Sequence, residues 1–204
     1  MAPVEPMILL LALTFGLLAS LTRAWVGGRR LTPPDLRLTW LTLVAFVPQW
    51  FVFYLPATRE LLADQLVVVG LVSSQALLLV FVWFNRRQPG FWVLGLGLAL
   101  NLLVIVFNGG LMPISPEIAA RLMPAAPLDP WQVGSRLGVT KDIILPVPET
   151  RLWWLSDRFL LSAWSYRVAF SPGDVFIAGG AFWLLWTLGG AKQAAKQEII
   201  QEAI

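Results

Sequence analysis

Long runs of apolar residues alternate with short polar segments along this chain. Runs of roughly 18 or more apolar residues with few charges have the length of a helix that crosses the apolar layer of a membrane. The pattern predicts an all-α polytopic membrane protein with five transmembrane helices, over residues 6–25, 38–55, 66–84, 91–107 and 172–190. Residues 1–204 then form a single membrane domain.

A long connector, residues 108–171, separates the fourth and fifth predicted helices, and residues 191–204 are expected to form an amphipathic tail. The connector is rich in tryptophan, a side chain that favours the headgroup level of a membrane. We therefore expect the connector to be structured. Its segment 151–168 either lies on the membrane surface or folds back over the helices.

Positive charge indicates the orientation of the chain. Arginines cluster in the short loops after the first and third apolar runs, and Lys192 and Lys196 follow the fifth. Since short basic loops stay on the cytoplasmic side, we expect the N-terminus and the connector to face outward and the C-terminus inward.

The amino-acid composition limits the kinds of reaction and ligand that this chain can support. The chain is 57% hydrophobic and 13% charged, whereas a soluble domain carries about 25% charged residues. It has no Cys and no His, which excludes thiol nucleophiles, disulfides and His-ligated metals. We expect no cofactor and no bound metal. The net charge of +3 comes from residues that flank apolar runs, so the expected partner is the lipid bilayer and not nucleic acid.

Ionisable residues are absent from the middle of every predicted helix, which argues against a pump or a coupled transporter. The neutral polar residues within them are interpreted as interhelical hydrogen-bonding groups, and include Gln49, Ser73, Ser74, Gln75 and Asn101. Small residues permit close helix contacts, so Gly95, Gly97, Gly179 and Gly180 predict that the fourth and fifth helices pack together.

The stretch VFNGGLMPISPE combines a helix stop with a helix start. Gly109 and Gly110 suit the positive φ that ends a helix, and Ser115 precedes a Pro-Glu pair typical of a first helical turn. The alternative for the two glycines is an anion-binding nest of backbone amides.

Two acids near the outer ends of the helices attract attention. Asp174 follows Ser171 at the spacing of a helix cap, and Asp157 has Arg151 and Arg158 available for a local salt bridge. The alternative is a pair of catalytic carboxylates, whose pKa values would have to differ. In that respect Asp157 and Asp174 resemble the two aspartates of the signal peptidases that cut bacterial lipoproteins, although the glycine-rich Gly-Asn stretch of those enzymes is absent.

Three ordered stretches, NGGLMPIS, ETRLWWLSD and SPGDVFIAGG, resemble the motifs of an uncharacterised family of bacterial membrane proteins, a domain of unknown function. The matching positions are Asn108, Gly109, Gly110, Met112, Pro113, Ser115, Thr150, Arg151, Leu152, Leu155, Asp157, Ser171, Gly173 and Asp174. The resemblance implies about five spans and a place in the bacterial cytoplasmic membrane. It implies no activity.

All three motifs fall on one expected face of the membrane. We therefore hypothesise that they form one polar cluster, in which Arg151 pairs with Asp157 or Asp174 and Asn108 donates to the connector backbone. Its members would be Asn108, Gly109, Gly110, Ser115, Thr150, Arg151, Asp157, Ser171 and Asp174.

Three functions suit this cluster. The first is a non-enzymatic scaffold or accessory subunit, which would bind other membrane protein subunits through the outer connector. The second is a membrane-edge aspartyl hydrolase that uses Asp157 and Asp174. The third is a protein that binds a lipid or small amphiphile through Arg151, Arg158 and the Gly109–Gly110 amides.

Overall fold

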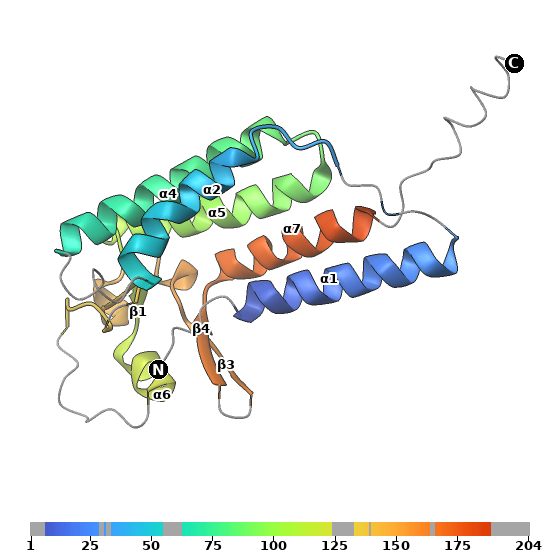
Figure 1. Cartoon of the computed structure of the whole chain (residues 1–204). Helices are drawn as coiled ribbons and strands as arrows, with labels where there is room; N and C mark the ends of the chain where they lie inside the picture. Colours follow the sequence, from blue (N-terminus) through green and yellow to red (C-terminus); the bar gives the residue numbers. More distant parts are fainter. Residues whose placement is uncertain are drawn as a thin grey trace, which may run out of the picture.

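The computed structural model describes residues 7–28, 31, 34–54, 63–123, 133–138, 140–163 and 166–188. The expected tail, residues 191–204, lies outside these ranges. In the described chain, apolar helices run side by side and a small cap covers one end of them (Figure 1). The long helices are α1 (Met7–Val26), α2 (Trp40–Gln49), α4 (Asp64–Phe84), α5 (Pro89–Phe107) and α7 (Pro172–Leu188).

Helices occur at all five predicted positions, and three of them have the length of a membrane span. Within the described residues, Ile8–Val26, Asp64–Phe84 and Pro89–Phe107 are long and apolar enough to cross a membrane, by length and composition alone. Trp40–Phe53 and Pro172–Leu188 are apolar but shorter. Pro48 lies near the end of α2, which continues directly into the π-helix η1 (Trp50–Tyr54).

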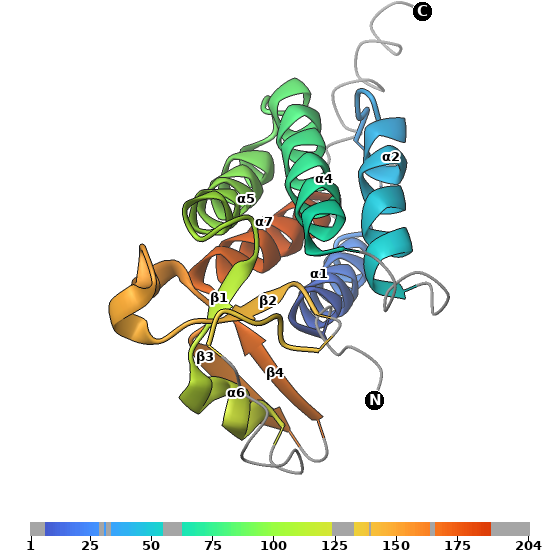
Figure 2. The ribbon, with the colours of Figure 1, turned by 90° about the vertical axis from the view of Figure 1, so that its left-hand side faces the viewer.

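The helices form a curved series. α1 packs on α7, α7 on α5, α5 on α4, and α4 on α2. Figure 2, which looks at the cap end, shows that the series bends round. Its two ends, α1 and α2, barely contact each other within the described chain. α1 and α2 therefore stand at the two ends of the series.

Glycines bring α5 and α7 together, as the sequence predicted. A methyl group on Gly97 would overlap the backbone of Gly173 and Ile177, and one on Gly180 would overlap the backbone of Leu94. The other two glycines named in the prediction do not contribute: Gly95 faces Val82 of α4, and the space beside Gly179 is open.

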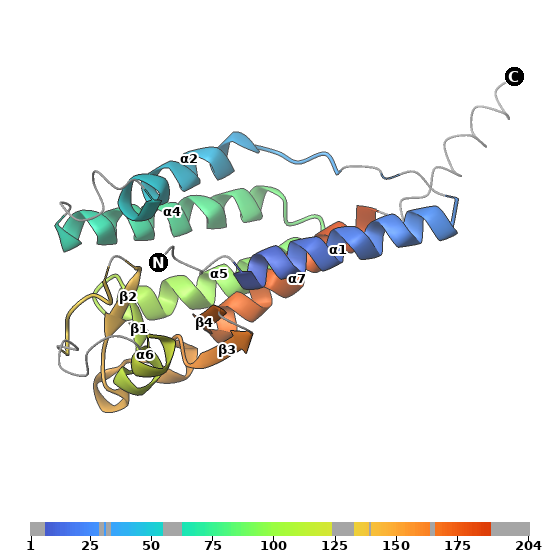
Figure 3. The ribbon, with the colours of Figure 1, turned by 60° about the horizontal axis from the view of Figure 1, so that its bottom comes forward.

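The cap contains strands, so the all-α expectation is wrong there. β1 (Met112–Ile114) pairs in parallel with β2 (Asp142–Ile144), and β3 (Phe159–Ala163) pairs antiparallel with β4 (Tyr166–Phe170). The remaining elements of the cap are the helix α6 (Pro116–Leu122) and the 3₁₀ turns η2 (Val147–Glu149) and η3 (Trp153–Leu155). Figure 3 shows these elements gathered at one end of the helices.

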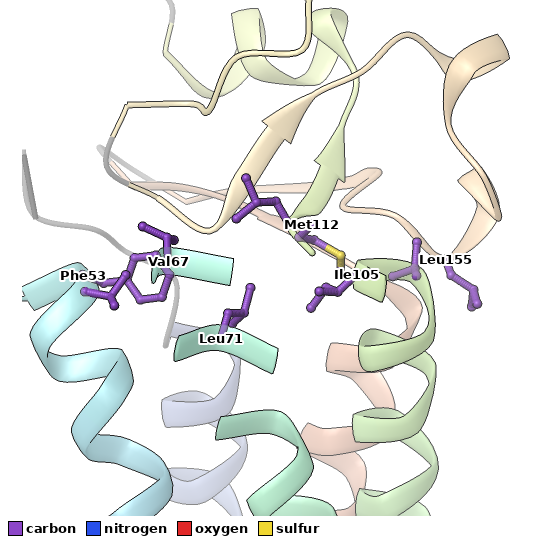
Figure 4. Packing of buried hydrophobic residues seen from close by; sticks show 9 residues of the cluster. Phe53, Val67, Leu71, Ile105, Met112 and Leu155 are labelled. Atoms are coloured by element: carbon purple, nitrogen blue, oxygen red, sulfur yellow. The ribbon is translucent and has the colours of Figure 1, made fainter. Parts of the chain in front are cut away.

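The cap and the helices share an apolar core. Met112 of β1 and Leu155 of η3 pack with Val67, Leu71 and Ile105 of the helices (Figure 4). Met112 and Leu155 are each only 1% exposed. The connector is thus a folded-back structure at this point, one of the two alternatives that the sequence left open.

Candidate functional site

Asn108 fastens the start of the cap to its middle. It ends α5, where Gly109 and Gly110 have φ values of +82° and +93°. Its side-chain amide donates to the carbonyl oxygens of Val104 and Arg151, at 2.7 and 2.8 Å, and its oxygen accepts from the Arg151 N–H at 2.9 Å. The expected donation from Asn108 to the connector backbone is present. It involves the backbone of Arg151, whose side chain is exposed.

The strand β1 is the hub of the cap. The Met112 N–H donates to the Lys141 carbonyl at 3.0 Å, and the Leu145 N–H donates to the Ile114 carbonyl at 3.0 Å. On its other edge the Asp157 N–H donates to the Pro113 carbonyl at 3.1 Å. The roles of Gly109, Gly110 and Ser115 in ending and starting helices did not account for Met112 and Pro113. In the structure these two residues belong to β1, the strand that fixes the position of Asp157.

Lys141 holds the Asp157 carboxylate. Its Nζ lies 2.6 Å from Asp157 Oδ2 and 3.3 Å from Asp142 Oδ1. Asp157 is 1% exposed and Asp142 is 3% exposed, so two buried carboxyl groups share this lysine. Arg151 and Arg158 do not supply the ion pair that we expected, because Lys141 takes that place and the Arg158 guanidinium lies over the Trp153 ring at 4.5 Å.

Burial raises the pKa of Asp157 to about 8, against the opposing attraction of Lys141. The negative charges of Asp142 and Asp174 raise this pKa further. Asp157 Oδ1 is buried with no hydrogen-bond partner in the described part of the chain. An unpaired buried oxygen is easier to accommodate on a protonated carboxyl than on a charged one. Burial thus favours the protonated form of Asp157.

A second polar group joins α5 to the start of α7. The Asn101 amide donates to Asp174 Oδ1 at 2.8 Å, and the Ser171 hydroxyl lies 2.9 Å from Asn101 Oδ1. Ser171 and Asp174 also cap α7 reciprocally: each backbone N–H donates to the other side chain, at 2.9 and 3.1 Å. The capping role predicted for Asp174 is therefore present.

A cavity of about 250 Å³ connects these two groups. Its walls are mostly apolar and come from α1, α2, η1, α4, α5, β4 and α7. They include Leu71, Leu78 and Leu98. Lys141 and Asp174 lie at its polar end, and Gln49 and Gln75 add amide groups from α2 and α4. Gln49 donates to the Ser74 hydroxyl at 2.7 Å, whereas the buried Gln75 Oε1 has no hydrogen-bond partner among the described residues.

The remaining members of the predicted cluster have local roles. The Ser115 hydroxyl accepts from the Ile118 N–H at 3.4 Å and caps α6, and the Thr150 hydroxyl donates to the Pro146 carbonyl at 3.0 Å. The Gly110 N–H donates to the Ile105 carbonyl at 2.8 Å, so helix termination uses an amide that an anion nest would need. The described hydrogen bonds therefore link the nine residues in several separate groups, and a single cluster of all nine stays a prediction.

Lys141 was not among the predicted site residues. This residue lies in the connector with no motif around it, yet it is the only lysine before position 192, which was a usable signal. Gln49, Gln75 and Asn101 were noted only as interhelical hydrogen-bonding groups. Within the described ranges, no group of three or more acids is placed to hold a metal ion.

The two aspartates of the hydrolase hypothesis have separate partners. Asp157 is held by Lys141, and Asp174 by Asn101 and Ser171. Each carboxylate therefore has a structural role, and neither exposes both oxygens for a substrate. The hydrolase stays a prediction that these contacts do not favour.

Comparison with known proteins supplies a family but no activity. A family of unknown function (DUF5317) matches residues 34–186, a range that contains all three sequence motifs. No curated protein and no solved structure gives a significant match to the chain.

Proposed function

This chain belongs to DUF5317, a family of unknown function, and from its own geometry we propose that it is a multi-pass membrane protein that binds a small amphiphile beneath its cap. The amphiphile is a molecule with an apolar body and a polar head. It would occupy the cavity that α1, α2, α4, α5 and α7 surround.

We propose that all five long helices cross the membrane, with the cap outside and the arginine-rich ends inside. The support is their arrangement: the three helices of full length and the two shorter ones lie side by side in Figure 1. Arg23, Arg86 and Arg87 lie at the ends of α1 and α4 that point away from the cap. The resemblance to a bacterial family favours the bacterial cytoplasmic membrane.

One observation carries the binding proposal: the cavity has apolar walls and a polar end. Burial of an apolar surface contributes about 25 cal/mol for each Å² removed from water, so the walls favour a hydrocarbon body. The polar groups at one end would fix the orientation of the head. This arrangement of walls and head groups is typical of a binding site.

Among the polar groups that line the cavity, the Asp174 carboxylate and the side-chain oxygen of Gln75 can accept hydrogen bonds. One ammonium, that of Lys141, faces the carboxyl groups of Asp142 and Asp157, and Asp174 lies nearby. The Gln75 oxygen is buried without a partner among the described residues. A head that donates hydrogen bonds, such as an alcohol or an amine, would satisfy these acceptors.

The test uses photoreactive alkyl probes of equal length that carry an amine, an alcohol or a carboxylate. We expect the amine and alcohol to label cavity-lining residues of the full-length protein in lipid vesicles, and the carboxylate to label them less. Leu78→Trp fills the cavity and should abolish this labelling. Leu103→Trp, a matched change on an exposed surface of α5, should not. Labelling that is equal in both variants would overturn the proposal.

The scaffold hypothesis has separate support from the surface of the cap. Trp153, Trp154 and Phe159 are 43–51% exposed there, which suits contact with another membrane subunit. The two proposals are separable, because the cavity lies beneath the cap and these aromatic side chains lie on it. Photocrosslinking from position 154 in intact membranes would favour a scaffold if it captured a protein and would oppose it if it captured only lipid.

A further inference from the structure

A second hollow lies on the side of the helices, at the end away from the cap. It measures about 300 Å³ and is formed by the last turns of α4 and the first turns of α5. Gly95, Leu96 and Ala99 line its apolar part, and Trp83, Arg86 and Trp92 line its other end. It shares no lining residue with the cavity beneath the cap.

Arg86 is held in place at the polar end of this groove. Its guanidinium lies 4.0 Å from the centre of the Trp83 ring, and its Nη1 donates to the Trp83 carbonyl at 2.8 Å. An arginine has five N–H donors in a planar fork, which matches the oxygens of a phosphate. The stacking fixes the plane of this fork before any ligand binds.

Asn85 holds the backbone of a further basic residue, Arg37, at the same end of the helices. Its buried amide donates to the Arg37 and Phe81 carbonyls, at 2.9 and 2.8 Å, and accepts from the Arg37 N–H at 2.8 Å. These bonds place the segment before α2 against the end of α4, where Arg86 and Arg87 follow. In residues 34–38 and 85–92 there are three arginines and one acid, Asp35.

Trp83 and Trp92 mark this end as a headgroup level. Their side chains are 58% and 61% exposed, on either side of the groove. Tryptophan favours the boundary between headgroups and acyl chains, and Leu96 and Ala99 continue from there toward the apolar layer. The groove therefore has a basic side chain, Arg86, at one end and apolar residues beyond it, as a phospholipid has a charged head followed by acyl chains.

We propose that this groove binds one anionic phospholipid, whose phosphate contacts Arg86 and whose acyl chain lies along Gly95, Leu96 and Ala99. Arg37 and Arg87 add attraction for an acidic headgroup, since basic clusters at helix ends attract anionic lipids. The proposal does not rest on the amphiphile site beneath the cap.

The experiment is native mass spectrometry of the full-length protein with phosphatidylglycerol or phosphatidylcholine of the same acyl chains. We expect preferential retention of phosphatidylglycerol. Arg86→Gln should lower its affinity by roughly fivefold, which corresponds to about 1 kcal/mol for one basic side chain near an anionic surface. Arg158→Gln is the matched control, because Arg158 also stacks on a tryptophan but lies in the cap.

A second variant tests the apolar part. Ala99→Phe leaves Arg86 in place but fills the exposed groove, and should also lower phosphatidylglycerol retention. Glycerol phosphate, which has the head without the acyl chains, should not be retained. Equal retention of the two phospholipids, or equal effects of Arg86→Gln and Arg158→Gln, would overturn the proposal. If Ala99→Phe leaves phosphatidylglycerol retention unchanged, the assignment of the lipid to this groove would be overturned.

Discussion

At the scale of residues, the cap contains an unusual balance of buried charge. Lys141 lies between Asp142 and Asp157, so one ammonium faces two carboxyl groups that are almost wholly buried. Burial makes ionisation of Asp157 costly in free energy, and the neighbouring carboxyl group of Asp142 adds to this cost. A proton on Asp157 removes this cost, in agreement with its raised pKa.

This raised pKa predicts that stability falls as pH rises. The pKa of Asp157 is about 8 in the folded protein, against an ordinary value of 3.8. Between these values the folded state binds the extra proton, so the free energy of unfolding decreases with increasing pH, by at most about 1.4 kcal/mol per pH unit. The contribution is fully present below pH 4 and lost above pH 8. Thermal unfolding midpoints in detergent from pH 5 to pH 8 would show this decline.

Asp157→Asn should flatten the pH dependence, because asparagine does not titrate. Asp64→Asn is the control: Asp64, like Asp157, has a basic partner, Arg136 at 3.6 Å, but its side chain is 69% exposed. An Asp157→Asn protein whose midpoint fell with pH as steeply as the unchanged protein's would contradict the assignment of the titration to Asp157.

Local polar contacts were predictable, whereas distant ones were not. Ser171 and Asp174 are three residues apart, and a cap needs no more than that spacing. Lys141 and Asp157 are 16 residues apart, and no pattern in the sequence links them. The sequence therefore suggested arginines as the partners of Asp157, because they were its neighbours along the chain.

At the scale of elements, α5 and α7 approach each other so closely that backbone atoms of one helix lie against backbone atoms of the other. The Gly97 position has no space for a side chain, whereas the Gly179 position, on the same pair of helices, has open space. Both glycines lie inside a helix, but only Gly97 must lack a side chain.

We expect Gly97→Ala to destabilise the protein and Gly179→Ala to leave its stability unchanged or raise it. Overpacking a close contact typically costs about 1–3 kcal/mol, while alanine in place of glycine within a helix gains roughly 0.5–1 kcal/mol. Thermal unfolding midpoints of the two variants in the same detergent give the measurement. A lower midpoint for Gly179→Ala than for Gly97→Ala would refute the close contact.

The positions of the helices could be predicted from the lengths of the apolar runs, but the positions of the strands could not. β1 has three residues and pairs with residues 142–144, about thirty positions later, and then with the backbone at Asp157. Strands this short show no alternating pattern, and their burial comes from residues of the helices and of the rest of the cap. The glycines at 109 and 110 indicated where α5 ends, but gave no sign that a strand follows.

At the scale of the whole molecule, opposite ends of the helices differ in character. The cap end is closed by strands and short turns, and the other end carries Arg86, Arg87 and Arg37. This polarity underlies the proposed orientation, because short basic loops stay in the cytoplasm. It can be tested simply, since the chain has no cysteine and a single introduced thiol gives no background.

We expect a membrane-impermeant maleimide to label Trp154→Cys in intact cells and Arg87→Cys only after the membrane is made permeable. Trp154 is 51% exposed on the cap, so its replacement is reachable by the reagent. The unchanged protein serves as the unlabelled control. Labelling of Arg87→Cys in intact cells would reverse the orientation, and labelling of both would contradict a membrane-spanning arrangement.

The packing of α1 on α7 has a consequence for biosynthesis. The ribosome makes α1 well before its main partner α7, so in the proposed arrangement α1 stays in the bilayer without that partner while the intervening helices are made. Its own hydrophobicity must hold it there. Accordingly α1 carries Arg23 in its last turn and no other charged residue, and its side chains remain largely exposed even in the finished fold.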